Sequence, residues 1–461
     1  MTLDSYIRSL RGKTVSVVGL GVSNRPLLRL LLDAGYAVTV RDKRTRDRFG
    51  EEEAAALENA GCRLVLGEAY LAGLTEDVIF RTPGLHPFTP ELAAAKERGA
   101  VLTSEMEAFF AVCPCRIIAV TGSDGKTTTT TMISELLKAQ GQRVFLGGNI
   151  GTPLLDKAPD MTPDDWAVLE LSSFQLHSMT CRPDISVITN VSPNHLDVHP
   201  SYEDYQTAKK QIFLSQGRSG ITVLNADNAI THAFSSDCPG EIRFFSRETA
   251  PENGVFLRDG VIYRSHCGKK TKLMDAENIL LPGLHNIENY MAAFAATDGI
   301  VSDDNCRAVA ESFRGVEHRL EMIRTLRGVT YCNDSIASSP TRTIAGLHAL
   351  RQKPILIAGG YDKHIPFDTL GDEICSHVKA LFLTGFTADK IYDAVIKSPL
   401  YDPESLPIRK IEDFREAVLA AAASATEGDI VLLSPACASF DRFRNFVERG
   451  ETFRSIVNEL K

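Results

Sequence analysis

The segment that most limits the fold is 116–131, RIIAVTGSDGKTTTTT. An apolar run ends at Gly122, a short turn carries Gly125 and Lys126, and a threonine-rich stretch that can begin a helix follows. The N–H groups of a glycine-rich turn bind phosphate oxygens, aided by the partial positive charge of a helix N-terminus. The order of strand, turn, lysine, hydroxyls and helix therefore predicts a phosphate-binding loop in an α/β protein.

This loop is shorter than the Walker pattern, because Val120 stands where a glycine is expected five residues before Gly125. Lys126 is expected to reach the terminal phosphates, and Thr127 or Thr128 to offer a hydroxyl to Mg²⁺. The other predicted nucleotide contacts are Gly122, Ser123 and Asp124. The alternative is a glycine- and threonine-rich turn that only caps a helix.

Length and charge narrow the class of protein further. At roughly 150 residues per domain, 461 residues indicate about three domains. The formal charge of −9 argues against a general binder of nucleic acid or anionic membranes. No apolar run reaches the roughly 18 residues of a membrane span, and Asp4 and Arg8 interrupt the start, so neither membrane insertion nor a signal peptide is expected. We expect a cytoplasmic monomer.

The ten cysteines contain no CxxC pair. This favours reduced thiols over a disulfide framework or a zinc site.

Short β-branched runs alternate with helical stretches along the whole chain, which is typical of βαβ units with mostly parallel sheets. Breaks near 110 and 315 divide the chain into blocks over 1–110, 111–315 and 316–461. The expected strands are 14–18, 37–41, 62–66, 78–82, 116–120, 166–171, 185–190, 220–224, 329–333, 355–358, 380–384 and 429–434, with helices over 24–34 and 286–297 and a hairpin over 254–264.

Two further side chains fall just past expected strand ends, where ligands gather in open α/β sheets. Glu170 ends the strand in VLELSSFQL, and His195 follows another strand in NVSPNHLDVHP. Each alone reads equally well as an ordinary surface or structural residue. Together, behind a phosphate loop, they indicate a Mg²⁺ site.

The first block begins with VVGLGVSN, a partial dinucleotide fingerprint that lacks the third glycine. Asp42 follows the second expected strand, about where a ribose-binding acid lies in Rossmann folds. An NAD-binding domain is one interpretation of this block.

Eight motifs in order carry a resemblance to a known family: TGSDGKTTTT, LELSSFQL, NVSPNHLD, LPGLHNIENYMAA, GVEHRLE, NDSIASSPT, GGYDK and SPACASFDRFRNFVERG. Together they resemble the Mur ligases of bacterial cell-wall synthesis, and the last resembles the members that add D-glutamate. The resemblance implies a UDP-binding Rossmann-like domain, a central ATPase domain and a C-terminal Rossmann-like domain. It also implies that ATP phosphorylates the carboxylate of UDP-MurNAc-L-alanine, and that the amine of D-glutamate then displaces phosphate.

The resemblance implies two magnesium ions. Thr127 and Glu170 match ligands of the ATP-side ion, and His195 matches a ligand of the second. Lys209, in YEDYQTAKKQIF, matches a lysine that CO₂ converts to a carbamate. Without the resemblance, Lys209 reads as a solvated lysine on a polar helix face.

The same resemblance assigns the substrate contacts. Asn286 and Asn289, one helical turn apart, match residues at the adenine end of ATP. Arg319 and Asp334 match a nucleotide-contacting arginine and a ribose-binding aspartate, so the ATP site is expected to form when domains close. The positions expected at the UDP-sugar are Gly21, Asp42, Lys43, Arg44, Thr82, Gly84, Asn149 and His195.

For D-glutamate, the matching positions are Ser338, Lys363, Ser439 and Phe446. The sequence departs from the family pattern at Ile336, where a lysine is expected. Isoleucine cannot neutralise the side-chain carboxylate of glutamate, so either another cation does so or the amino-acid pocket differs.

Three alternatives remain open. A sibling of the same superfamily could add another amino acid or act on folate, although SPACASFDRFRNF argues against this. A P-loop kinase or motor would use ATP without forming an amide. A non-enzymatic nucleotide switch would leave the C-terminal motifs unused.

Overall fold

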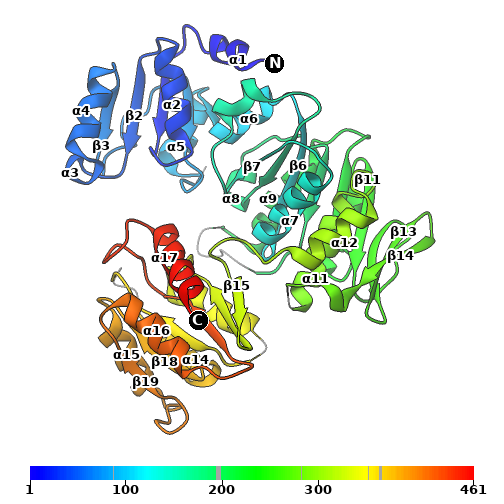
Figure 1. The fold of residues 1–461 in the computed structure, drawn as a ribbon. Helices are drawn as coiled ribbons and strands as arrows, with labels where there is room; N and C mark the ends of the chain where they lie inside the picture. The colour runs from blue at the N-terminus through cyan, green and yellow to red at the C-terminus, as the bar shows by residue number, and fades with distance from the viewer. Residues whose placement is uncertain (87, 194–198, 282, 351, 363–365) are drawn as a thin grey trace. The chain divides into compact units, whose positions relative to one another are not determined.

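The computed structural model describes residues 1–86, 88–193, 199–281, 283–350, 352–362 and 366–461. Contacts divide the chain into two compact units, Met1–Ile279 with Leu284–Glu311, and Leu280–Gly283 with Ser312–Lys461. The first unit holds two sheets and the second holds one, and helices pack on each sheet (Figure 1). The α/β class expected from the sequence is confirmed.

The N-terminal sheet is entirely parallel, with strand order β3-β2-β1-β4-β5. Its strands are β1 (Val15–Val18), β2 (Val38–Asp42), β3 (Arg63–Leu66), β4 (Val78–Arg81) and β5 (Val101–Thr103). Its helices are α1 (Leu3–Ser9), α2 (Asn24–Asp33), α3 (Arg46–Phe49), α4 (Glu51–Asn59), α5 (Pro90–Glu97) and α6 (Glu105–Val112). The strand order reverses between β1 and β4, which is where ligands bind in such sheets.

The central sheet runs in the order β14-β13-β12-β11-β10-β9-β6-β8-β7. Its strands are β6 (Arg116–Thr121), β7 (Val144–Gly148), β8 (Trp166–Glu170), β9 (Ile185–Ile188), β10 (Ile221–Asn225), β11 (Glu241–Ser246), β12 (Gly254–Arg258), β13 (Val261–His266) and β14 (Lys269–Asp275). Its helices are α7 (Lys126–Ala139), α8 (Ser173–Leu176), α9 (Tyr202–Leu214), α10 (Ala229–Ala233), α11 (Leu284–Ala296) and α12 (Asp303–Ser312). The hairpin expected over 254–264 is formed by β12 and β13.

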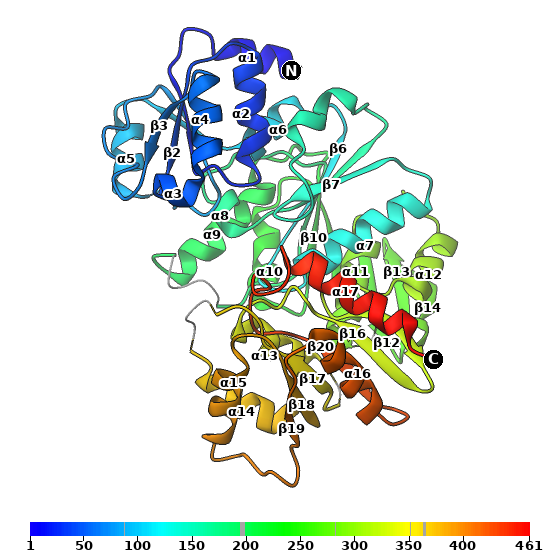
Figure 2. The same cartoon turned by 60° about the vertical axis from the view of Figure 1, so that its left-hand side comes forward.

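The helices of this sheet cover both of its faces. Helix α9 buries Tyr205, Ile212 and Phe213 in one apolar cluster with Ala119 and Leu169 of the sheet. Helices α7 and α11 contact each other, and α11 also contacts β9 to β12 (Figure 2). The loop after β6 therefore leads into helix α7. It lies at the centre of the parallel strands.

The C-terminal sheet has the order β15-β16-β20-β17-β18-β19, parallel except for the β15–β16 pair. Its strands are β15 (Glu321–Leu326), β16 (Val329–Asn333), β17 (Ile355–Ala358), β18 (Ala380–Leu383), β19 (Ile408–Lys410) and β20 (Ile430–Leu433). Its helices are α13 (Pro340–Ala349), α14 (Asp368–His377), α15 (Ala388–Ile396), α16 (Phe414–Ser424) and α17 (Phe446–Glu459). Helices α13 to α15 pack on one face, and α16 and α17 on the other.

All ten cysteines are free thiols, as expected. Among the described residues, no helix is long and apolar enough to cross a membrane.

Candidate active site

The loop between β6 and α7 depends on two glycines with left-handed backbone angles. Gly122 has φ 152° and Gly125 has φ 76°. A Cβ atom on Gly122 would collide with the Thr189 hydroxyl, and one on Gly125 would collide with the side-chain oxygen of Asn289. Because neighbouring elements press on both positions, glycine is required there for its conformation and for its size.

The first half of the loop is fastened to the segment that follows β9. The N–H of Ser123 donates to the Asn190 carbonyl at 2.9 Å, and the N–H of Asp124 donates to Asn190 Oδ1 at 3.0 Å. The Thr189 hydroxyl donates to the Asp124 carbonyl at 2.5 Å. Helix α7 begins directly after the loop, and the N–H groups of its first turn have no partner within the helix. This arrangement can bind an anion.

Lys126 bends back over the loop. Its Nζ donates to the carbonyl oxygens of Gly122 at 2.9 Å and Ser123 at 2.8 Å. The side-chain nitrogen of Lys126 therefore lies against the turn that leads into α7.

Glu170, at the end of β8, joins two other predicted residues. Its carboxylate accepts from the Thr127 hydroxyl at 2.7 Å and from Asn149 Nδ2 at 2.8 Å. The N–H of Asn149 also donates to the Glu170 backbone carbonyl, so the segment after β7 follows β8 closely. Glu170 is only 2% exposed. A carboxylate, a hydroxyl and an amide oxygen are the oxygen donors that Mg²⁺ prefers, so these residues fit such an ion.

Lys209, on α9, is buried against the same loop. It is 1% exposed, its Nζ donates to the Gly122 carbonyl at 2.7 Å, and it lies 4.5 Å from the centre of the Tyr205 ring. Burial, followed by repulsion from Lys126, lowers the pKa of Lys209 well below its usual value. The reading of Lys209 as a solvated surface lysine is therefore wrong.

Tyr205, one residue past Asp204 on the same helix, was not singled out from the sequence. Its hydroxyl lies 2.9 Å from the Ser123 hydroxyl, which in turn donates to the Ser192 carbonyl at 3.0 Å. The ring is 1% exposed. The phosphate loop is thus held by α9 as well as by the segment after β9.

Asn286 and Asn289 lie together on α11, as their spacing predicted. Asn289 Nδ2 donates to Asn286 Oδ1 at 3.3 Å, and the Thr129 hydroxyl of α7 donates to Asn289 Oδ1 at 3.3 Å. Both asparagines are buried, and the side chain of Asn289 lies against Gly125. Asn289 therefore borders the phosphate loop.

The N-terminal sheet carries a pocket of about 310 Å³ at the carboxyl ends of β1, β2 and β4. It gathers six residues that we expected at the UDP-sugar, together with five that we did not: Val18, Gly19, Leu20, Tyr70 and Leu85. The predicted members are Gly21, Asp42, Lys43, Arg44, Thr82 and Gly84. A pocket at this switch point is the expected place for a nucleotide-like ligand.

Asp42 is already fully engaged within this pocket. Its carboxylate accepts from the Leu20 N–H at 2.9 Å and from Arg44 Nε and Nη2 at 2.9 and 2.8 Å. Burial alone would raise the pKa of Asp42, but the hydrogen bonds from Arg44 outweigh it and lower that pKa. Asp42 therefore shapes the glycine turn, and a ribose hydroxyl would have to share it with Arg44.

In the second unit, Asp334 follows β16 and is 4% exposed. It accepts from the Ser434 hydroxyl at 2.7 Å and from the Leu320 N–H at 3.2 Å. Burial raises the pKa of Asp334 to about 7, although Ser434, Leu320 and the charge of Arg319 oppose this. Arg319 itself is exposed.

The D-glutamate positions that the structure describes lie in segments that follow strands of the same sheet. The Ser338 N–H donates to the Ile336 carbonyl at 2.8 Å. Ser439 is 2% exposed, and its carbonyl accepts from the N–H groups of Arg442 and Phe443. Phe446 begins α17, where its carbonyl accepts from the Ser335 hydroxyl at 2.8 Å.

Arg449, which was not singled out from the sequence, organises these loops. It is 2% exposed and donates to the Ser335 hydroxyl at 3.0 Å and to the carbonyls of Ser335, Cys437 and Ala438. Burial lowers its pKa to about 10. Its only sequence signal is its place within RNFVERG. His195 and Lys363 lie outside the described residues.

Comparison with known proteins agrees with this arrangement. The chain matches the family models "Mur ligase middle domain" over residues 120–297 and "Mur ligase, glutamate ligase domain" over 318–437. It is 48% identical to a UDP-N-acetylmuramoylalanine--D-glutamate ligase of Acetivibrio thermocellus, covering 100% of this chain and 99% of the relative. It is 45% identical to a ligase of the same name from Clostridium acetobutylicum, covering 99% of each.

Solved structures share the fold. A UDP-N-acetylmuramate-alanine ligase of Thermotoga maritima matches with a TM-score of 0.56 at 17% identity, covering 97% of this chain and 100% of that one. A UDP-N-acetylmuramoyl-L-alanyl-D-glutamate--2,6-diaminopimelate ligase matches with a TM-score of 0.54 at 20% identity, covering 84% and 93%. The phosphate loop and the Thr127–Glu170–Asn149 group agree with the high sequence identity over the full length of the chain. The chain therefore belongs to the Mur ligase family, among the UDP-N-acetylmuramoylalanine--D-glutamate ligases.

Proposed function

We propose that this chain joins D-glutamate to UDP-N-acetylmuramoyl-L-alanine with ATP, through an acyl-phosphate intermediate, in peptidoglycan synthesis. The main support is the contact of Glu170 with Thr127 and Asn149 at the end of the phosphate loop. Further support is the identity of the whole chain to ligases that carry this name.

The chemistry explains why a phosphate loop serves an amide ligase. A carboxylate is a poor electrophile, so its oxygen first attacks the γ-phosphorus of ATP and ADP leaves. The neutral amine of D-glutamate then attacks the acyl carbon, phosphate leaves, and the new amide nitrogen loses a proton. Lys126 and the first turn of α7 stabilise the charge on the transferred group, and positioning supplies much of the remaining rate.

Thr127 and Glu170 are the ligands that we propose for the ATP-side Mg²⁺, with Asn149 orienting the carboxylate. A bound ion of this kind neutralises phosphate charge. His195 and a carbamate on Lys209 are proposed to hold a second Mg²⁺.

The carbamate follows from the state of Lys209. Because burial lowers the pKa of Lys209, this lysine loses its proton more readily than an exposed one. The lone pair of the neutral amine can then attack CO₂, which forms a C–N bond and releases a proton. The product is an anion, so it replaces a group that would repel Mg²⁺ with one that attracts it.

The substrate contacts are proposed as follows. The UDP-sugar binds at the pocket of Gly21, Asp42, Lys43, Arg44, Thr82 and Gly84, with Asn149 and His195 nearer the reacting carboxylate. The nucleotide is bound by Asn286, Asn289, Arg319 and Asp334, and D-glutamate by Ser338, Lys363, Ser439 and Phe446. We propose domains over 1–110, 111–315 and 316–461, and a monomer that works in the cytoplasm.

The test is mass spectrometry of the product from UDP-N-acetylmuramoyl-L-alanine, ATP, Mg²⁺ and a panel of amino acids. We expect a product heavier by one glutamyl residue, with D-glutamate and not with L-glutamate. Addition of another amino acid would reject the assigned specificity. Phosphate release without an amide product would reject the ligase function and favour a P-loop kinase or ATPase.

A further inference from the structure

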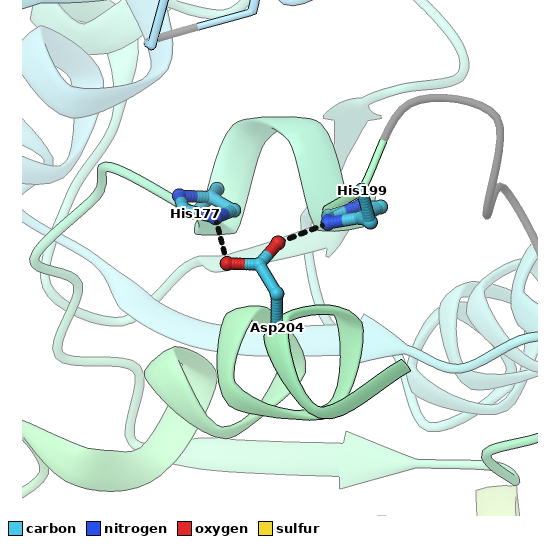
Figure 3. A group of neighbouring side chains, drawn as sticks. All are labelled: His177, His199 and Asp204. Atoms are coloured by element: carbon cyan, nitrogen blue, oxygen red, sulfur yellow. Dashed lines mark hydrogen bonds and ion pairs between the residues drawn. The ribbon is translucent and has the colours of Figure 1, made fainter. Parts of the chain in front are cut away.

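A second polar cluster lies close to the candidate active site, and the proposed reaction does not use it. It consists of His177 after α8, His199 before α9 and Asp204 in the first turn of α9 (Figure 3). The Asp204 carboxylate accepts from His177 Nε2 at 2.8 Å and from His199 Nδ1 at 2.7 Å. One potential ligand atom from each residue lies within 4.8 Å of the other two.

The cluster is sheltered from water. The side chains of His199, His177 and Asp204 are 0%, 10% and 23% exposed. Each oxygen of the Asp204 carboxylate is bonded to one of the two histidines, so all three side chains face one another. Two imidazoles and an ionised carboxylate form a donor set typical of zinc.

The His199 ring is held in one orientation. Its second nitrogen, Nε2, lies 3.0 Å from the Ser173 hydroxyl, and the ring stacks on Phe174 with centroids 5.4 Å apart. The Tyr205 ring packs nearly at a right angle to it, with centroids 5.2 Å apart. A hydrogen bond on the second nitrogen is the usual way in which a protein orients a histidine ligand.

A third imidazole lies beside the cluster. The His86 ring, in the loop after β4, is centred 5.7 Å from that of His177 and 6.4 Å from that of His199. Histidines that share a tetrahedral ion at about 2 Å have ring centres about 5 Å apart. His86 Nε2 is buried without a hydrogen-bond partner in the described part of the chain. Its unpartnered nitrogen is therefore the ring atom of His86 that is placed to coordinate an ion.

We propose that His177 Nε2, His199 Nδ1 and the Asp204 carboxylate bind one divalent transition-metal ion of the zinc class, with His86 as the fourth ligand. The nitrogen donors distinguish this site from the oxygen donors at Thr127 and Glu170, since imidazole favours Zn²⁺ over Mg²⁺. Each imidazole would coordinate through the lone pair of one ring nitrogen, with the proton on the other. On His199 the other nitrogen is Nε2, which would donate to the Ser173 hydroxyl.

Such an ion would join the loop after β4, the end of α8 and the start of α9. Helix α9 also carries Tyr205 and Lys209, which contact the phosphate loop. We therefore expect metal binding to raise the thermal stability of the first unit. This inference does not depend on the substrate proposed above.

The test uses the full chain, stripped with a chelator and titrated with Co²⁺ in excess Mg²⁺, which occupies the oxygen-donor sites. We expect one equivalent of Co²⁺ to give the intense visible absorption of a tetrahedral site. Zn²⁺ should abolish this absorption and raise the melting temperature of the protein. Asp204→Asn should weaken binding at least about tenfold, because it removes the charged ligand. If the wild-type protein binds no Co²⁺ with the tetrahedral absorption, the proposal is overturned, whether or not the variant folds.

The matched control is the more exposed group of His348, Glu373 and His377 on α13 and α14, which also places three ligand atoms close together. Glu373→Gln should leave the tetrahedral absorption unchanged. Loss of that absorption in Glu373→Gln, with retention in Asp204→Asn, would move the ion to the other unit and reject our site. His86→Ala should weaken binding, and unchanged affinity would reject His86 as the fourth ligand.

Discussion

The side-chain nitrogen of Lys209 lies 2.7 Å from the carbonyl oxygen of Gly122, the same oxygen that accepts from Lys126 at 2.9 Å. Two lysines therefore converge on one carbonyl of the phosphate loop. The fully buried one is less able to keep its proton, because burial and the neighbouring charge both disfavour an ammonium. Of the two, Lys209 is therefore the lysine that we expect to react as an amine.

We predict that Lys209 carries a carbamate in the presence of CO₂. ¹³C-bicarbonate should give a carbamate carbon signal in the NMR spectrum of the wild-type protein. Lys209→Arg should lose both this signal and most ligase activity. The adjacent Lys210, which forms an ion pair with Asp237 at 2.5 Å, provides the control Lys210→Arg, in which both should persist. Full activity in Lys209→Arg would contradict the assignment.

We predict that Lys126→Ala lowers kcat by at least about 100-fold, because one cation stabilises the charge on the transferred phosphoryl group. The measurement is amide formation by mass spectrometry, with circular dichroism to check the fold. Lys138→Ala, on the exposed end of the same helix, should retain normal turnover. A folded Lys126→Ala enzyme with near-normal kcat would exclude this lysine from the mechanism.

We predict that Glu170→Gln raises the Mg²⁺ concentration needed for half-maximal activity by about tenfold. Glutamine keeps an oxygen that accepts from Thr127, but it lacks the charge that attracts the ion. Titration of phosphate release with Mg²⁺ measures the change. Glu135→Gln on the exposed side of α7 serves as the control, and equal Mg²⁺ dependence of the two variants would count against the proposed ligand.

We predict that Glu105→Gln makes the protein more stable toward urea at pH 8 than the wild type, but not at pH 4.5. Burial raises the pKa of Glu105 from 4.5 to about 7, so between these values the folded chain holds a proton that the unfolded chain has lost. The contribution of Glu105 to the free energy of unfolding of the wild type is thus greatest below pH 4.5, and it falls as the pH rises toward 7. The difference should reach about 3 kcal/mol.

Glutamine keeps the oxygen that accepts from the Leu155 N–H at 3.1 Å, so the substitution changes charge without removing this contact. Exposed Glu97→Gln is the control, and its stability relative to the wild type should not change with pH. If the stability of Glu105→Gln relative to the wild type also does not change with pH, the Glu105 carboxyl is not held protonated in the folded protein.

We predict that Lys363→Ala raises the KM for D-glutamate at least about tenfold and changes the KM for the UDP-sugar far less. With Ile336 in place of a lysine, a carboxylate of the substrate needs another cation. Equal weakening of both substrates would indicate a role in domain closure. If D-glutamate binding is unchanged, Arg342, which donates to the Ile336 carbonyl at 3.2 Å, is the next cation to test.

Much of the fold follows from local sequence. The buried strands β1, β6, β8, β16 and β17 appear within a residue or so of the expected bounds, since continuous apolar runs and glycine breaks mark them clearly. Strands such as β7 and β15 were not anticipated. Their side chains are mostly half-buried, so their residues lack the apolar continuity of a central strand.

Less of the candidate site could be predicted from the sequence. The Thr127–Glu170 pair could be expected because both residues follow central parallel strands. The engagement of Asp42 by Arg44, the bond between Tyr205 and Ser123, and the four acceptors of Arg449 could not. Each of these depends on side-chain rotamers and on segments that the fold brings together, which residue spacing does not specify.

Gly122 and Gly125 have a consequence for inhibitors. Any side chain added at either position meets Thr189 or Asn289, and both backbones are left-handed. A compound that makes its main contacts with the backbone of these two residues would bind a surface that point mutations cannot easily reshape. Drug resistance would then have to arise elsewhere in the chain, through residues that tolerate change.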